Sequence, residues 1–269
     1  MASRRTITGF SNPLVKYLRS LREKKHRKRE GVFLAEGLRL LTDARECGIL
    51  PSILVMATGR EAHPLLDALE DAVAAAGGDV VEMDIDILAK VTGKDNPQAV
   101  AGVFAEFDTS LAALDRATAP IWLVAQALRD PGNLGTMLRT GDAVGAGGLI
   151  LIDDCADPFS VEAVRASMGA IFTQRIAIAR WDEFLPWLRG GAGQLVAASL
   201  RDPTDYRQAA YTAPCFLLIG NESQGLPDTY EAECDLRVTI PMLGRADSLN
   251  AAVAGAVLAY EALAHLGKN

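Results

Sequence analysis

The stretch "IWLVAQAL" (121–128), followed by "RDPGNLGTMLRTGDAVGAGG" (129–148) and "LILIDD" (149–154), indicates the fold class. Its first and last segments are nearly continuous apolar runs, which are typical of parallel strands buried on both faces of a sheet. The segment between them is predicted to be a helix. Strand, helix and strand with short connections form a βαβ unit, so the stretch predicts an α/β domain with a parallel sheet.

The segments after this unit continue the alternation of strands and helices. Strands are predicted at 174–179, 194–200, 215–219 and 236–240, and helices at 161–172, 181–190 and 248–266. Residues 120–269 are therefore predicted to form one domain with a parallel sheet of about six strands. Residues 1–105 alternate in the same way and predict a small α/β domain, and residues 106–119 are predicted to be a linker.

Charge is distributed unevenly along the chain. Its 269 residues carry a net charge of −7, but residues 1–30 hold ten Lys and Arg against two Glu. A basic arm on an acidic body favours a polyanionic partner, since phosphate contacts supply much of nucleic-acid affinity. A solvated, self-repelling charged face is the alternative. A transit peptide is disfavoured, because helical spacing at Leu14, Leu18 and Leu21 continues without a cleavage signal.

Several classes of protein and site find no support in the sequence. No apolar run approaches the roughly 18 residues of a membrane span, so no membrane partner is expected. Cys47, Cys155, Cys215 and Cys234 and the three His are scattered. This predicts reduced thiols, a cytoplasmic protein and no metal site. The segment 132–139, "GNLGTMLR", lacks dinucleotide-binding spacing, and neither a P-loop nor a Ser-His-Asp triad is present.

Three loops that follow predicted strands are rich in glycine and polar side chains. The first holds Asn133, with Arg139 six residues later; the others are "GNESQG" (220–225) and "GRADSLN" (244–250). Ligands of parallel sheets bind outside the carboxyl ends of the strands, so these loops are predicted to form one site. Glycine allows backbone N–H groups to approach a ligand closely.

Three segments, in order, resemble the motifs of the SpoU/TrmH branch of the SPOUT methyltransferases: "NLGTMLRTGDAVGA" (133–146), "LLIGNESQGL" (217–226) and "IPMLGRADSLNAAVAGAVLAYE" (240–261). "DPFSVEAVRASMGAIF" (157–172) resembles the segment between the first two motifs. Residues 12–41 resemble the substrate-binding N-terminal domain of the ribosomal-RNA members. The resemblance implies a C-terminal parallel-sheet domain with a deep trefoil knot (the SPOUT fold), preceded by a small α/β N-terminal domain.

The resemblance also implies an activity and its site residues. Members transfer a methyl group from S-adenosyl-L-methionine to a ribose 2'-hydroxyl of RNA, and they are usually homodimers, here through the C-terminal domain. By motif match, the expected catalytic residues are Asn133, Arg139, Glu222, Ser248 and Asn250. The expected cofactor-binding residues are Gly220, Ile240, Met242 and Leu249.

Methyl transfer from a sulfonium is chiefly a task of positioning the acceptor oxygen. We expect Arg139 to hold a phosphate and stabilise the developing alkoxide, because guanidinium is a poor base; direct deprotonation by Arg139 is the alternative. Asn133, Ser248 and Asn250 would orient ribose, cofactor or Arg139 by hydrogen bonds. Asn133 could instead only cap its helix, and Glu222 could be a solvated loop acid. We expect Ser248 to be a helix cap as well as part of the site.

The basic residues are expected to bind RNA, with ribosomal RNA favoured over transfer RNA because of the N-terminal domain. These residues are Arg4, Arg5, Lys16, Lys24, Lys25, Arg27, Lys28, Arg29 and Arg165. Two other functions stay open from the sequence alone. One is a non-catalytic RNA-binding factor of ribosome assembly on the same fold, and the other is a nucleotide-dependent oxidoreductase.

Overall fold

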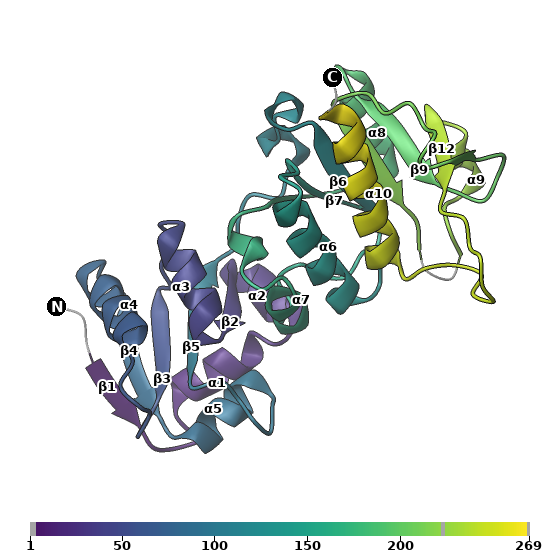
Figure 1. Ribbon diagram of the computed structural model, residues 1–269. Coiled ribbons are helices and arrows are strands. Elements are labelled where there is room, and N and C mark those ends of the chain that lie inside the picture. The colour runs from purple at the N-terminus through teal and green to yellow at the C-terminus, as the bar shows by residue number, and fades with distance from the viewer. Residues whose placement is uncertain (1–3, 222–223, 268–269) are drawn as a thin grey trace. The chain divides into compact units, whose positions relative to one another are not determined.

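The computed structural model describes residues 4–221 and 224–267 and confirms an α/β protein (Figure 1). The chain forms two compact units, each with its own β-sheet. Unit 1 contains Met1–Phe107 and Asp157–Phe172, and unit 2 contains Asp108–Ala156 and Thr173–Asn269. The chain therefore passes between the units three times.

Unit 1 is built on a five-stranded sheet in the order β1-β4-β3-β5-β2. The strands are β1 (Arg4–Ile7), β2 (Val32–Glu36), β3 (Ile53–Ala57), β4 (Asp79–Met83) and β5 (Val100–Ala105). Strands β1, β4 and β3 are parallel, whereas β5 runs antiparallel to β3 and β2. Strand β1 was not predicted, because "RRTI" carries no apolar run; as a short edge strand it tolerates charge.

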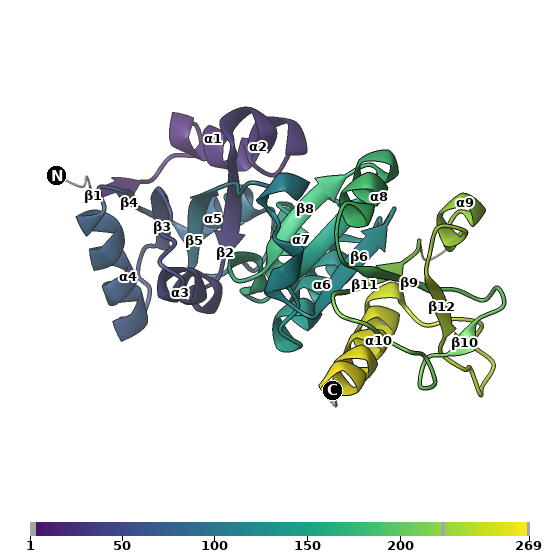
Figure 2. The same cartoon turned by 90° about the horizontal axis from the view of Figure 1, so that it is seen from above.

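Helices cover both faces of this sheet (Figure 2). They are α1 (Pro13–Ser20), α2 (Lys24–Glu30), α3 (Leu38–Glu46), α4 (Pro64–Ala75) and α5 (Ile85–Thr92). Leu18 of α1 and Leu88 of α5 are fully buried in one core cluster with Val55 and Val81 of the sheet. Helices α3, α4 and α5 lie between successive strands β2 to β5, which confirms the alternation of strands and helices predicted for residues 1–105.

Unit 2 is built on a seven-stranded sheet in the order β10-β12-β9-β11-β6-β7-β8, with every neighbouring pair parallel. The strands are β6 (Ile121–Gln126), β7 (Gly148–Ile152), β8 (Arg175–Ala179), β9 (Gln194–Ala198), β10 (Thr204–Asp205), β11 (Cys215–Ile219) and β12 (Leu236–Thr239). Six of them confirm the predicted parallel sheet. The seventh, β10, has two residues and is too short to give a periodic signal.

Helices also cover both faces of the sheet of unit 2. Helices α6 (Pro131–Ala143) and α10 (Ala251–Leu266) pack together on one face, and α8 (Trp181–Arg189) packs on the other (Figure 2). The short helix α9 (Asp228–Glu231) precedes β12. The segment predicted to be a linker contains two single-turn helices, η1 (Leu111–Ala113) and η2 (Arg116–Thr118).

The structure differs from the predicted domain division at residues 157–172, which pack into unit 1. This segment contains helix α7 (Val161–Ala166) and the single turn η3 (Ala170–Phe172). The rings of Phe159 and Phe172 lie 5.2 and 6.1 Å from that of Phe33 in β2. Aromatic side chains bury large apolar areas, so the contacts of Phe159 and Phe172 with Phe33 stabilise the packing of this segment in unit 1.

The same segment provides the partner of a buried arginine in α2. The Arg27 side chain is 2% exposed and donates from Nη2 to Oδ2 of Asp157 at 2.6 Å. Its Nη1 donates to the backbone carbonyls of Leu21 and Arg22, each at 2.8 Å. This corrects the expectation that Arg27 binds RNA: its guanidinium is enclosed within unit 1 and holds Asp157–Phe172 in place.

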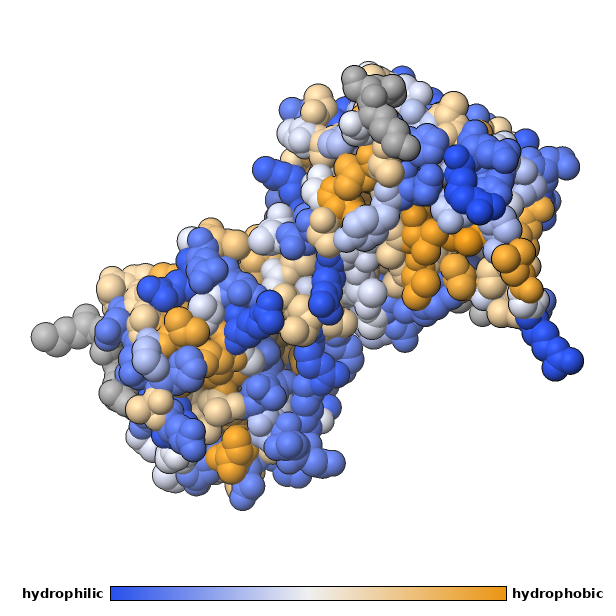
Figure 3. All heavy atoms as spheres, in the orientation of Figure 1, coloured by the Kyte–Doolittle hydropathy of each residue, from blue (hydrophilic) through white to orange (hydrophobic). Residues whose placement is uncertain are grey.

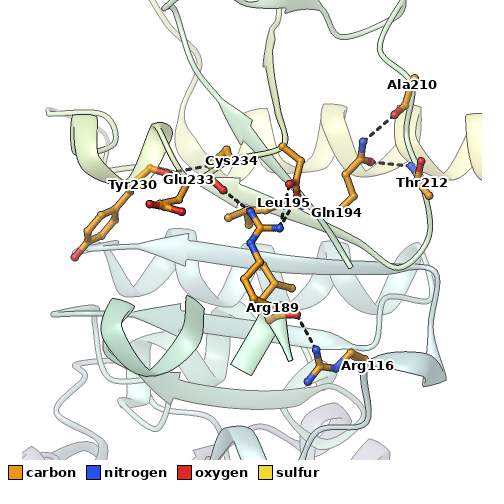
Figure 4. A network of polar contacts seen from close by, with 11 residues as sticks. Arg116, Arg189, Gln194, Leu195, Ala210, Thr212, Tyr230, Glu233 and Cys234 are labelled. Atoms are coloured by element: carbon orange, nitrogen blue, oxygen red, sulfur yellow. Dashed lines mark hydrogen bonds and ion pairs between the residues drawn. The ribbon is translucent and has the colours of Figure 1, made fainter. Parts of the chain in front are cut away.

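A network of polar contacts fixes the relation of β9 to β12 (Figure 4). Arg189, at the end of α8, donates from Nη1 to both carboxylate oxygens of Asp235 at 3.0 and 2.9 Å. Oδ2 of Asp235 also accepts from the backbone N–H of Leu195 at 2.7 Å. The side chain of Gln194 donates to the carbonyl of Ala210 at 2.9 Å. Because Leu195 lies in β9 and Asp235 directly precedes β12, these contacts fix the start of β12 against β9.

Candidate active site

The loops after β6, β11 and β12 come together at the carboxyl edge of the sheet in unit 2. The amide of Asn221, after β11, donates to the carbonyl of Ala127, after β6, at 2.8 Å. Nδ2 of Asn250, in the loop after β12, donates to Oδ1 of Asn133 at 2.8 Å. The structure therefore joins the first and third motifs by a direct side-chain hydrogen bond.

Asn133 does not cap its helix, so that alternative is excluded. The N-cap of α6 is Asp130, whose carboxylate accepts from the backbone N–H of Asn133 at 2.7 Å. Pro131 occupies the first helical turn, where its missing N–H carries no cost. Because Asp130 caps the helix, the side chain of Asn133 can bond to Asn250 instead.

Asn250, not Ser248, caps α10. Oδ1 of Asn250 accepts from the backbone N–H groups of Ala252 at 2.9 Å and Val253 at 3.3 Å. The prediction that Ser248 is a cap is wrong, since Ser248 lies two residues before the cap and is exposed. Only an amide offers an acceptor for the helix and a separate donor for Asn133 at the same time.

We expect Asn250→Ala to lower the free energy of unfolding by about 1 kcal/mol, the typical value of an N-cap. Ser248→Ala is the matched control and is expected to change it by less than about 0.5 kcal/mol, as for most exposed positions. Urea denaturation followed by circular dichroism measures both. A larger loss in Ser248→Ala than in Asn250→Ala would contradict this assignment of the cap.

A pocket of about 450 Å³ lies beside this junction. It is lined by all four residues expected to bind the cofactor, Gly220, Ile240, Met242 and Leu249, and by Ser248. Its other lining residues come from the ends of β9, β11 and β12 and from α9 and α10: Ala198, Ser199, Leu200, Arg201, Ile219, Asn221, Gln224, Gly225, Leu226, Glu231, Val238, Thr239, Asp247, Ala251, Ala254 and Leu258. The mixture of apolar side chains and a few polar groups is typical of a small-ligand site.

Two further catalytic candidates are Arg139, which does not line this pocket, and Glu222. Arg139 lies in α6, is exposed, and makes no ion pair within residues 4–221 and 224–267. A guanidinium in this state can bind a phosphate through two parallel hydrogen bonds. Glu222 lies outside the described residues.

Three of the four cysteines, Cys155, Cys215 and Cys234, are at least partly buried. Burial raises the pKa of the Cys155 thiol to about 11 and the pKa values of Cys215 and Cys234 to about 12. These three thiols are therefore protonated at neutral pH and are poor nucleophiles. In the part of the chain that is described, no group of three His, Cys, Asp or Glu side chains could hold a metal ion, and no helix could span a membrane.

The residues expected to bind RNA all belong to unit 1, on β1, α1, α2 and α7. Those with exposed side chains are Arg5, Lys16, Lys24, Lys25, Lys28, Arg29 and Arg165. A second pocket, of about 540 Å³, is lined within this unit by Lys16, Arg19, Ser20, Arg22, Glu23, Thr92, Val161 and Glu162. Two of its cations, Arg19 and Arg22, were missing from the predicted set, although both lie in the basic arm.

Seven polar residues of the pocket in unit 2 were also missed: Ser199, Arg201, Asn221, Gln224, Glu231, Thr239 and Asp247. Ser199 directly follows β9, but the predicted strand, 194–200, ran past it, so its place at a strand end was not recognised. Gln224 and Asp247 lie inside the quoted motifs. Arg201 and Glu231 had no sequence signal, because an isolated charged residue is usually a solvated surface group.

This fold and site define an α/β protein that binds a small ligand at the carboxyl edge of a parallel sheet. The chain belongs to the SpoU rRNA methylase family, whose model matches residues 120–260. Residues 12–102 match the MRM3-like substrate binding domain.

Several relatives match over nearly the whole chain. The AdoMet-bound rRNA methyltransferase from Sinorhizobium meliloti is 39% identical, with a TM-score of 0.91 over 98% of both chains. The SpoU methyltransferase AviRb from Streptomyces viridochromogenes, also solved with AdoMet, is 28% identical, with a TM-score of 0.85 over 96% of this chain and 100% of that one. The 23S rRNA (guanosine(2553)-2'-O)-methyltransferase RlmP of Bacillus subtilis (strain 168) is 30% identical over 94% of this chain and 97% of its own.

Proposed function

We propose that this protein transfers a methyl group from S-adenosyl-L-methionine to a ribose 2'-hydroxyl of ribosomal RNA. The hydrogen bond between Asn133 and Asn250 carries the proposal, because it joins two motifs beside the pocket lined by Leu249. Membership of the SpoU family and the AdoMet-bound relatives support the reaction and the cofactor.

The pocket in unit 2 fits S-adenosyl-L-methionine. Its volume of about 450 Å³ lies within the range of small-molecule sites. A Cβ at Gly220 would lie 2.7 Å from the backbone carbon of Gly225, so the turn after β11 closes tightly against itself. Gly220, Ile240, Met242 and Leu249 would hold the cofactor, which supplies a methyl group activated on a sulfonium.

The chain's own residues would position the acceptor and stabilise charge. We assign to Arg139 the binding of the phosphate next to the target ribose and the stabilisation of the developing 2'-alkoxide. Asn250 is fixed by its capping bonds and therefore holds the amide of Asn133 in one orientation. This rigidity suits a reaction that depends on placing one oxygen in line with a methyl carbon.

Unit 1 is proposed to bind the RNA through the exposed cations of α1, α2 and α7. Support comes from the +8 charge of residues 1–30 and from the match to a substrate-binding domain. Neutralising several phosphates makes binding strongly dependent on salt, so affinity for RNA should fall steeply between low and physiological salt.

The assembly and location of the protein belong to the same proposal. We infer a homodimer that forms through unit 2, where Figure 3 shows apolar side chains gathered around α10. Val253 and Tyr260 of α10 are 47% and 55% exposed, which is high for such side chains on an alanine-rich helix. A trefoil knot in unit 2 and a cytoplasmic location, in keeping with four free cysteines, complete the proposal.

Methyl transfer from labelled S-adenosyl-L-methionine to unmodified RNA and to ribosomal particles tests the proposal. The expected result is label in ribosomal RNA and one linkage that becomes resistant to alkaline cleavage. Label confined to transfer RNA would overturn the substrate. Cofactor binding without label in any fraction would favour the non-catalytic assembly factor.

Gly220→Ala is expected to weaken binding of S-adenosyl-L-methionine at least tenfold, because the new methyl group meets backbone atoms that cannot rotate away. Gly255→Ala is the matched control: its Cβ would lie 3.5 Å from Cε of Met137, an ordinary contact, and binding should stay within about twofold. Calorimetry gives both affinities. Unchanged binding in Gly220→Ala would place the cofactor elsewhere.

A further inference from the structure

Glu231 is a buried carboxylate that lines the pocket of unit 2. Its side chain is 8% exposed, and within the described residues its Oε2 has no hydrogen-bond partner. Among the described residues, the one cation within 4 Å of this oxygen is Arg201, whose Nε lies 3.8 Å from Oε2, which is beyond hydrogen-bond distance. A buried carboxylate oxygen without a hydrogen-bond partner lowers the stability of the fold unless a positive charge offsets the loss of hydration.

Arg201 offsets this charge only in part. Its guanidinium is 55% exposed and forms a closer ion pair with Asp228. The exposed carboxylate of Asp247 also lines the pocket. Among the described lining residues, two acidic side chains therefore face one basic side chain, and the balance favours a cationic ligand.

We propose that Glu231 makes this pocket prefer the cationic methyl donor to its neutral product, which rests on the function proposed above. S-adenosyl-L-methionine carries a sulfonium and an ammonium against one carboxylate, a net charge of +1. Transfer breaks the bond between sulfur and the methyl carbon, forms a bond from that carbon to the 2'-oxygen, and releases the hydroxyl proton to solvent. The product, S-adenosylhomocysteine, has lost the sulfonium charge and is neutral overall.

Apart from the transferred methyl group, donor and product differ only in the charge on sulfur. Coulomb attraction falls slowly with distance where water is excluded, so Glu231 can act on this charge without touching sulfur. The consequence is faster exchange of product for fresh donor after each reaction.

Calorimetric titration of the full chain with donor and product tests the inference. Glu231→Gln is expected to raise the Kd for S-adenosyl-L-methionine about three- to tenfold and the Kd for S-adenosylhomocysteine less than twofold. Glu233→Gln is the matched control: it removes the same charge from an exposed position outside the pocket, and neither Kd should change by more than about twofold.

Arg201→Gln provides a second, opposite test, because it removes the cation that opposes Glu231. It should tighten binding of the donor relative to the product about twofold, whether or not Glu231→Gln folds. Equal effects on both ligands, or none on either, overturn the inference and leave the proposed function intact. A wild-type protein that binds no S-adenosyl-L-methionine overturns the proposed function and this inference with it.

Discussion

Replacement of Arg139 by alanine is expected to lower the rate of methyl transfer about 10²- to 10³-fold, the usual effect of removing one donor to a developing oxyanion. Binding of S-adenosyl-L-methionine should stay within about twofold, because Arg139 does not line the pocket. Single-turnover methylation of ribosomal RNA, with calorimetry of the cofactor alongside, separates the two effects. A variant that keeps more than a fifth of the rate would remove Arg139 from the reaction.

Arg139→Lys distinguishes the two roles left open for this residue. Lysine keeps the positive charge but loses the planar fork that binds phosphate through two hydrogen bonds. If Arg139 stabilises charge, the variant should be slow at every pH, with an unchanged profile. If Arg139 were the base, the lower pKa of lysine would shift the pH–rate profile to lower pH and restore activity at alkaline pH.

Arg27→Ala is expected to destabilise unit 1 by about 3–5 kcal/mol, because it leaves the carboxylate of Asp157 without its charged partner. Circular dichroism during urea denaturation reports both units. All three tryptophans, Trp122, Trp181 and Trp187, lie in unit 2, so their fluorescence follows that unit alone. The expected result is a circular dichroism transition at lower urea that precedes the fluorescence transition.

Lys28→Ala is the control for this experiment, since Lys28 is the exposed neighbour of Arg27 and should change stability by less than about 0.5 kcal/mol. The double variant Arg27→Met, Asp157→Leu should recover most of the loss, because an apolar pair of similar volume often replaces a buried ion pair without cost. A loss below about 1 kcal/mol in Arg27→Ala would show that the ion pair does not hold Asp157–Phe172 in unit 1.

The sequence predicted the parts of the fold that have long, strong patterns. The run 121–128 became β6, and its neighbours became α6 and β7, because buried parallel strands need continuous apolar residues. Strands β1 and β10 gave no such signal, since one is an edge strand with two arginines and the other has two residues. The four expected cofactor-binding residues do line one pocket, because strand ends share one edge of the sheet.

The sequence could not predict which of two residues of similar type takes a structural role when that role depends on contacts with distant parts of the chain. Ser248 and Asn250 both suit an N-cap by type, but α10 begins at Ala251, so Asn250 is the cap and its amide also donates to Asn133. Arg27 resembles the exposed cations on either side of it, and its burial depends on Asp157, which is 130 residues away in the chain. The burial of Glu231 in the pocket could likewise not be predicted, because many of the other residues that line the pocket come from distant parts of the chain.

The passage of Asp157–Phe172 into unit 1 constrains how this protein can exchange parts with its relatives. A chimera that takes only residues 1–107 from a relative would pair a foreign sheet with native Phe159 and Phe172, and a foreign α2 with native Asp157. Replacement of the whole of unit 1 therefore requires two separate segments of the gene, those for residues 1–107 and 157–172, to be exchanged together. Recombination at a single point near residue 107 would produce mismatched cores, so unit 1 should evolve by point substitution more readily than by replacement.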